Sequence, residues 1–168
     1  MKGMRMKVQI KKISLMSLLV FSSGMYSGWF EHVKNGDENV VQYWLEEKKQ
    51  YVEERDGNRR TAMHWAAQYG HTGVAKILLK HKADINATNR NKWTPLHTAA
   101  SFNRVAMIEW LVNHGADMDI ENLHHWRPVD IAKADAAECL RLLMQRKKAE
   151  GEQKQRRSDA VAAARSRE

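Results

Sequence analysis

One stretch of sequence occurs twice in this chain, with an offset of 33 residues. RTAMHWAAQYGHTGVAKILLKHKADIN begins at Arg60, and WTPLHTAASFNRVAMIEWLVNHGADMD begins at Trp93. A Thr, a His and an Ala-Ala pair stand at matching places in both. A period of 20–50 residues indicates a solenoid, in which each unit buries its apolar face only by stacking on its neighbours. The chain is therefore expected to fold as a row of similar units.

Two weaker copies flank this pair. WRPVDIAKADAAECLRLLM begins at Trp126, and WFEHVKNGDENVVQYWLEE begins at Trp29. The sequence thus predicts about four units, with a leader before them and a tail after them. The expected boundaries are 1–24 for the leader, 25–55, 56–88, 89–121 and 122–145 for the units, and 146–168 for the tail.

Residues that start and stop helices recur at fixed places in each unit. Thr61 and Thr94 are good helix N-caps, and Pro95 and Pro128 suit a first helical turn, where no N–H is needed. Gly70 suits a helix end that turns through positive φ. Each unit should therefore contain a first helix, a tight turn and a second helix.

The two helices of a unit differ in the size of their apolar residues. Small residues such as Ala99 and Ala100 line the first helix, whereas Met107, Leu111 and Val112 follow helical spacing in the second. Small side chains allow the first helices of neighbouring units to approach closely. The second helices then supply the bulky apolar layer.

TPLHTAA at Thr94 and TAMHWAA at Thr61 resemble the ankyrin repeat in both signature and period. The resemblance covers roughly residues 28–145. It implies an all-α solenoid, in which each unit is a β-turn finger followed by two antiparallel helices.

The sequence departs from the family pattern at the finger turns and in the last unit. Arg59, Lys92 and His125 stand where the family usually has Gly. A left-handed backbone would cost each about 1 kcal/mol relative to Gly, and a different turn geometry is the alternative. Arg127 replaces Thr and Asp130 replaces His in the fourth unit, as expected of a terminal unit with a solvated outer face.

The resemblance implies a non-catalytic protein that binds another protein through finger tips and the inner face of the first helices. The corresponding positions in the fingers are Gly57, Asn58, Arg60, Arg90, Asn91, Trp93, Leu123, His124 and Trp126. Those on the inner helices are Lys34, Asn35, Gln68, Tyr69, Ser101, Phe102, Ala134 and Asp135.

Trp93 and Trp126 occupy one place in consecutive units, which in the family points outward from the finger. A row of exposed aromatics suggests a contact site, and Tyr69 and Phe102 would extend it. The alternative is that each indole folds back over its own turn. Both alternatives place the two rings at the fingers.

No arrangement of residues indicates catalysis, a metal or a cofactor. His64 and His97 stand at the signature position, where the imidazole usually holds the turn together. The pair His124-His125 lacks an evident third ligand for a metal. Cys139 is the single cysteine and lies in an apolar helical pattern, so we expect a buried side chain and no disulfide.

The formal net charge of +8 belongs to the two ends of the chain. Residues 1–24 carry +5 and residues 145–168 carry +4, which leaves −1 for residues 25–144. The body is thus not expected to bind nucleic acid. The tail has almost no large apolar residues and is expected to be disordered or helical. As an alternative function, it could contact nucleic acid or another acidic partner.

The leader has a basic start, a nine-residue apolar run at 13–21 and small residues at 22–24. This order is that of a secretory signal cleaved near Gly24. The run is too short to span a bilayer, so no transmembrane span is expected. We favour a monomeric intracellular protein of the cytoplasm or nucleus. The alternative is an exported protein that protects or regulates an enzyme.

Overall fold

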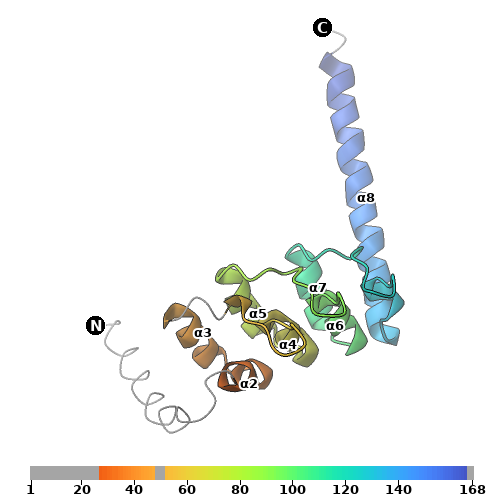
Figure 1. Ribbon diagram of the computed structural model, residues 1–168. Helices are drawn as coiled ribbons and strands as arrows, with labels where there is room; N and C mark the ends of the chain where they lie inside the picture. The colour runs from red at the N-terminus through yellow and green to blue at the C-terminus, as the bar shows by residue number, and fades with distance from the viewer. Residues whose placement is uncertain (1–26, 48–51, 166–168) are drawn as a thin grey trace, which may run out of the picture.

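The computed structural model describes residues 27–47 and 52–165, and within these residues all regular structure is helical (Figure 1). The predicted leader 1–24 lies outside the described residues. The elements are α2 (Ser27–Asn35), α3 (Glu38–Glu47), α4 (Ala62–Tyr69), α5 (Thr72–Lys80), α6 (Pro95–Ser101), α7 (Val105–Asn113), the 3₁₀ turn η2 (Pro128–Asp130) and α8 (Ala134–Arg165). The expected all-α solenoid is confirmed.

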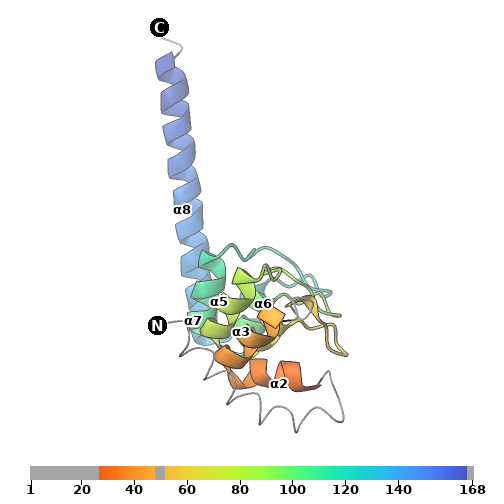
Figure 2. The same ribbon diagram turned by 90° about the vertical axis from the view of Figure 1, so that its left-hand side faces the viewer.

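The helices form antiparallel pairs that stack in a row (Figure 1). The first helices α2, α4 and α6 pack against one another in order, and the second helices α3, α5 and α7 form a parallel layer. The loops between units gather on one side of the helices (Figure 2). We call residues 56–60, 89–93 and 122–126 the fingers of units two, three and four.

The helix ends form where the sequence places them. The Thr94 hydroxyl accepts a hydrogen bond from the backbone N–H of His97 at 3.3 Å, and Pro95 occupies the first turn of α6. Gly70 ends α4 at a φ of 80°. In the third unit Asn103 takes the corresponding left-handed conformation, with a φ of 55°.

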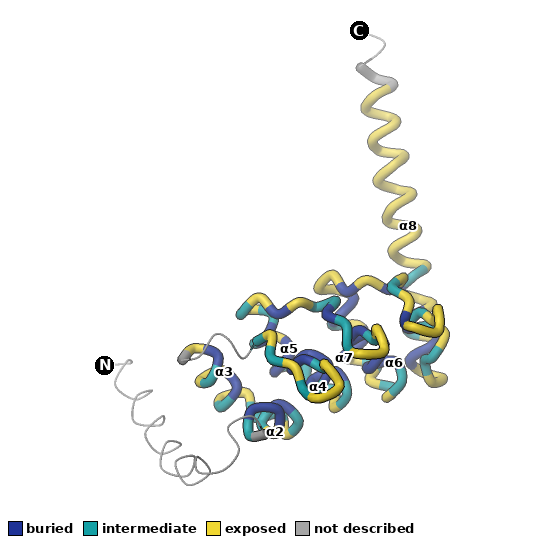
Figure 3. The backbone as a smooth tube through the Cα atoms, viewed as in Figure 1, coloured by how far each residue is buried: buried dark blue, intermediate teal, exposed yellow. Residues whose placement is uncertain are grey.

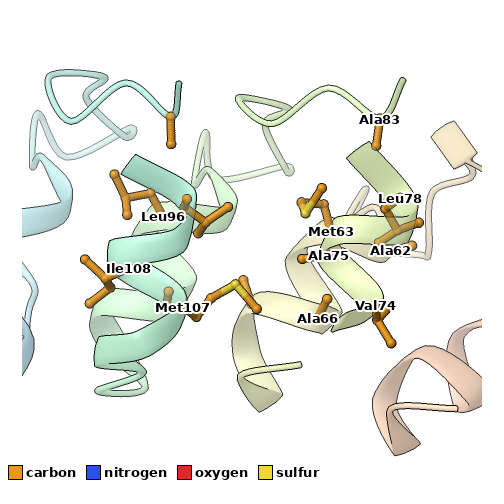
Figure 4. Packing of buried hydrophobic residues seen from close by; sticks show 14 of the residues in the cluster. Ala62, Met63, Ala66, Val74, Ala75, Leu78, Ala83, Leu96, Met107 and Ile108 are labelled. Atoms are coloured by element: carbon orange, nitrogen blue, oxygen red, sulfur yellow. The ribbon is translucent and has the colours of Figure 1, made fainter. Parts of the chain in front are cut away.

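The core consists of two kinds of layer. The alanine pairs Ala66-Ala67 and Ala99-Ala100 are fully buried between the first helices, as their small size predicts. The larger apolar side chains of the second helices, among them Leu78 and Ile108, fill the interior beside them (Figure 4). Buried residues run through the whole row of units (Figure 3).

The fourth unit has no full first helix, which corrects the prediction for Ala134 and Asp135. Both lie in the first turn of α8, not on an inner helix. Asn103 contacts this first turn, because its Oδ1 accepts a hydrogen bond from Ala136 N at 2.9 Å and its Nδ2 donates to Asp135 Oδ2 at 3.0 Å. This cap from the preceding unit starts α8 directly after the short turn η2.

The helix α8 continues far beyond the stack (Figure 1). Its first turns pack on α7 and bury Leu140. The Nη2 atom of Arg146 donates a hydrogen bond to Asn113 Oδ1 at 2.7 Å. Residues 147–162 are all exposed, so the segment predicted as a basic tail is a projecting helix (Figure 3). Among the described residues no helix combines the length and the apolarity that crossing a membrane requires.

We predict that Ala100→Leu destabilises the protein more than Ser101→Leu does. Ala100 is fully buried between stacked helices, where overpacking costs about 1–3 kcal/mol. Ser101 is half-buried at the end of α6, and its substitution should cost about 0.5 kcal/mol or less. Urea unfolding of the two variants measures the difference, and equal midpoints would show that the faces are assigned wrongly.

Candidate partner-binding surface

Each finger begins with an Asp or Asn whose side chain closes the turn. The Oδ1 atom of Asp56 accepts hydrogen bonds from the backbone N–H groups of Asn58 at 2.8 Å and Arg60 at 2.9 Å. Asn89 and Asn122 accept the equivalent pairs of bonds in the next two fingers. The residues two and four places after each acceptor are therefore held in one conformation.

The tip residue of each finger adopts a left-handed backbone conformation, although none of the three is a glycine. Arg59, Lys92 and His125 have φ values of 59°, 57° and 59°. In each finger the N–H of the tip residue donates to the carbonyl of the Asp or Asn three residues earlier, for example from Lys92 to Asn89 at 3.1 Å. The alternative of another turn geometry is therefore wrong.

The signature histidines join each unit to the next finger. The Nδ1 atom of His64 accepts from the backbone N–H of Thr61 at 3.2 Å, so its Nε2 carries the proton and donates to the carbonyl oxygen of Trp93 at 2.9 Å. His97 bonds to Trp126 O in the same way, at 2.9 Å. The predicted structural role of both histidines is confirmed.

Burial keeps both imidazoles neutral. Desolvation lowers the pKa of His64 to about 4, although the hydrogen bond to the Trp93 carbonyl acts in the opposite direction. Desolvation also lowers the pKa of His97 below its usual value. Because a neutral imidazole has one donor and one acceptor nitrogen, each ring satisfies both of its hydrogen bonds at neutral pH.

A cluster of cations and aromatic rings lies on the inner face of the second unit. The guanidinium carbon of Arg60 lies 3.7 Å from the centre of a Trp65 ring, and Lys34 Nζ lies 4.5 Å from it. Trp65 also stacks on Tyr69, with centroids 6.3 Å apart. Cation–π contacts of this kind fix the two long basic side chains. The sequence analysis did not identify Trp65 as a contact residue. The signal was a large ring at the place where the other clear copy has Thr98.

Arg60 is held by an ion pair as well. Its Nε donates to Asp56 Oδ2 at 2.8 Å, and both side chains are largely buried. Burial would raise the pKa of Asp56, but hydrogen bonds from the backbone and side chain of Arg60 and from Asn58 N lower it below its usual value. Arg60, predicted as a contact residue, is thus half-buried and internally paired.

The two predicted indoles differ in exposure. Trp93 is half-buried and stacks on His97, with centroids 6.2 Å apart. Trp126 remains 50% exposed and lies beside His124, with centroids 5.1 Å apart. Both rings were predicted to point outward. The half-buried Trp93 agrees better with the alternative, in which the indole covers its own turn.

The other predicted contact residues lie on the fingers or at the ends of the first helices. Arg90, Asn91 and His124 are exposed on the fingers, and Tyr69 and Phe102 are exposed at the ends of α4 and α6. Two more are half-buried, namely Gln68 and Ser101. We call the exposed side of the fingers and of the ends of α4 and α6, which includes these residues and Leu123 and Trp126, the inner surface.

The described residues include no group of three His, Cys, Asp or Glu side chains placed to hold a metal ion. Cys139 is a free, half-buried thiol on α8. Burial raises the pKa of this thiol, which disfavours the reactive thiolate.

Comparison with known proteins supports the repeat assignment. Residues 29–122 match the family model for ankyrin repeats, in three copies. The chain is similar to the integrin-linked protein kinase homolog pat-4 of Caenorhabditis elegans, with 34% identity over 62 residues. It is also similar to the serine/threonine-protein kinase VIK of Arabidopsis thaliana, with 39% identity over 59 residues. These segments cover 37% and 35% of this chain, but only 13% and 14% of the two curated relatives.

The lowered pKa of His64 predicts a loss of stability in mild acid. Between pH 6.5 and pH 4 the unfolded chain binds a proton at this residue that the folded chain does not, so the free energy of unfolding falls as pH falls through this window. From pH 7 to pH 5 the expected loss from His64 is about 2 kcal/mol. Urea unfolding across this range measures it.

The matched variant is His64→Gln, which removes the titrating group. It should be less stable than the wild type at pH 7 and should show a flatter pH dependence between pH 7 and 5. Parallel pH profiles for the two proteins would contradict the assignment of the titration to His64.

Proposed function

Because this chain belongs to the ankyrin repeat family, we propose that it is a non-catalytic module that binds another protein through its inner surface. Ankyrin repeats are typically protein–protein interaction modules. The proposal assigns the contact to the fingers and to the ends of α4 and α6, where the predicted residues lie.

One observation carries this proposal, namely where large apolar side chains are exposed. Among the described residues, exposed large apolar side chains on the inner surface are Tyr69, Phe102, Leu123 and Trp126. Tyr69 and Phe102 stand 33 residues apart at equivalent places in two successive units, and Leu123 and Trp126 lie together on the finger of the fourth unit. Exposed apolar patches mark interaction sites, and aromatic residues dominate the energy of protein interfaces.

Further properties belong to the same proposal. A monomeric, intracellular protein fits a chain whose one thiol is free and half-buried. Export remains the alternative, and sequencing the amino terminus of the natural protein would decide between them. The chain spans about one seventh of the length of the two kinases that it resembles.

We predict that Trp126→Ala weakens partner binding by about 2 kcal/mol and leaves the melting temperature nearly unchanged. The ring is half exposed, so its removal costs the fold little. The full-length protein would capture its partner from the native source, and calorimetry would then compare the variants. Trp93→Ala should lower the melting temperature, because this indole stacks on His97.

Tyr43→Ala is the matched control for this test. Tyr43 is an exposed aromatic residue on α3, away from the fingers, so its loss should change neither affinity nor stability. Equal affinities of Trp126→Ala and Tyr43→Ala for the captured partner would contradict the proposed surface.

The projecting part of α8 favours a second candidate function, a contact with nucleic acid. Residues 147–162 are exposed all round the helix and carry no apolar stripe that could pack on a protein. The segment 145–168 has a net charge of +4. A basic helix of this kind binds phosphates through charge alone, whatever the inner surface binds.

We predict that a chain truncated after Arg146 loses salt-dependent binding to a 20-base-pair DNA duplex. Counterion release makes such binding weaken steeply between about 50 and 200 mM salt. The truncation keeps the Arg146–Asn113 bond, so the stack should melt at the same temperature as the full chain. Unchanged DNA affinity in the truncated chain would rule out the tail as the contact.

A further inference from the structure

All three finger tips carry basic residue types in a conformation that glycine would adopt at lower cost. Arg59, Lys92 and His125 are exposed, and each has a positive φ. Strain that persists in exposed turns is a feature of functional sites, where the side chain matters more than the conformational cost. His125 Nδ1 lies 2.9 Å from Glu121 Oε2, so the two tip side chains that need an explanation outside the folding of the turns are Arg59 and Lys92.

The cations of the first two tips have no internal partner. Among the residues that the structure describes, no acidic side chain forms an ion pair with Arg59, Lys92 or the neighbouring Arg90. Arg60, by contrast, is tied to Asp56 and to Trp65. The unpaired group thus lies on the outermost part of the fingers, where a partner reaches it without breaking a contact.

The charge of the body is divided between its surfaces. The three fingers carry four basic residues and one acid, Asp56, which is already paired. The loop that leads into the third of these fingers carries Asp117, Asp119 and Glu121 and no basic residue between them. Residues 25–144 together have a net charge of −1, so the positive finger edge stands out against a slightly acidic body.

We infer that Arg59, Arg90 and Lys92, on the fingers of units two and three, form a cationic row that docks an acidic segment of the protein partner. This inference rests on the proposed function and names the chemistry of the partner. Stacked helices lie about 8–10 Å apart, and an extended chain advances about 3.3 Å per residue. Two carboxylates three residues apart in an extended segment therefore match the tips at Arg59 and Lys92.

A protein segment fits this row better than a nucleic acid strand does. Base stacking needs free ring faces, and Trp93, the ring next to the tip at Lys92, is half-buried and already stacks on His97. A long phosphate chain that continued past the last finger would also meet the acids at 117–121. A short acidic segment avoids this repulsion.

The test compares two lysines that share a backbone conformation. Lys82 is exposed in the loop after α5 with a φ of 68°, and Lys92 is exposed at a finger tip with a φ of 57°. Lys82→Gly and Lys92→Gly each remove one positive charge and one left-handed lysine. Both full-length variants should melt a few degrees higher than the wild type, because glycine adopts positive φ freely.

Binding of a fluorescein-labelled ten-residue oligoglutamate, measured by anisotropy at low salt, separates the two variants. We expect Lys92→Gly to weaken binding by roughly twofold to fivefold, the range for one exposed charge pair, and Lys82→Gly to leave it unchanged. The double variant Arg59→Gly/Lys92→Gly should bind oligoglutamate more weakly by about the product of two such factors. In the background Arg156→Gln/Arg157→Gln, which removes two charges from the projecting helix, Lys92→Gly should weaken binding by the same factor as in the wild type.

Several outcomes would overturn the inference. Equal losses in Lys82→Gly and Lys92→Gly would indicate general charge attraction, and a loss confined to Arg156→Gln/Arg157→Gln would place the site on α8. Tighter, Lys92-dependent binding of a ten-nucleotide oligothymidine would make the row a nucleic acid site. No binding of oligoglutamate would also refute it, whereas capture of the natural partner, tested through Trp126, would leave the proposed function intact.

Discussion

The stack depends on a buried imidazole that bonds in two directions. In each of the two complete units the ring accepts a hydrogen bond from the backbone before its own helix and donates one to the carbonyl that ends the next finger. A buried imidazole with one bond missing would leave an unsatisfied polar atom in the core. The histidine at the start of the first helix therefore makes both of its hydrogen bonds only when the next unit is folded against it.

The last unit shows what happens where this bond is no longer needed. Asp130 replaces the histidine, and its Oδ2 still accepts from the N–H of Arg127 at 2.8 Å. A carboxylate accepts hydrogen bonds and has no donor to offer, so Asp130 cannot make the inter-unit bond that the histidines make. The first helix shrinks to the turn η2, and Asn103 of the unit before supplies the cap for α8. In the last unit the hydrogen bond between Asp130 and Arg127 is thus kept, and the bond that joins a histidine to the next finger is absent from the described residues.

The sequence predicts those features that each unit determines within itself. Thr94, Pro95 and Gly70 act locally, so the helix boundaries of the middle units follow from them. Trp93 stacks on His97, and Lys34 of the neighbouring unit lies over the ring of Trp65. Such contacts arise only after stacking, and no spacing rule encodes them. The inner surface was therefore predictable in outline, but not the exposure of its individual rings.

The free part of α8 has a mechanical consequence. From Arg146 to Arg165 the helix advances about 1.5 Å per residue, so its far end stands about 28 Å from the stack. A ligand held at that end and a protein held by the fingers would be kept at a set separation. Such a spacer raises the effective concentration of one bound molecule near the other without any contact between them. The fingers and the far end of α8 would thus hold their two ligands at a fixed distance from each other.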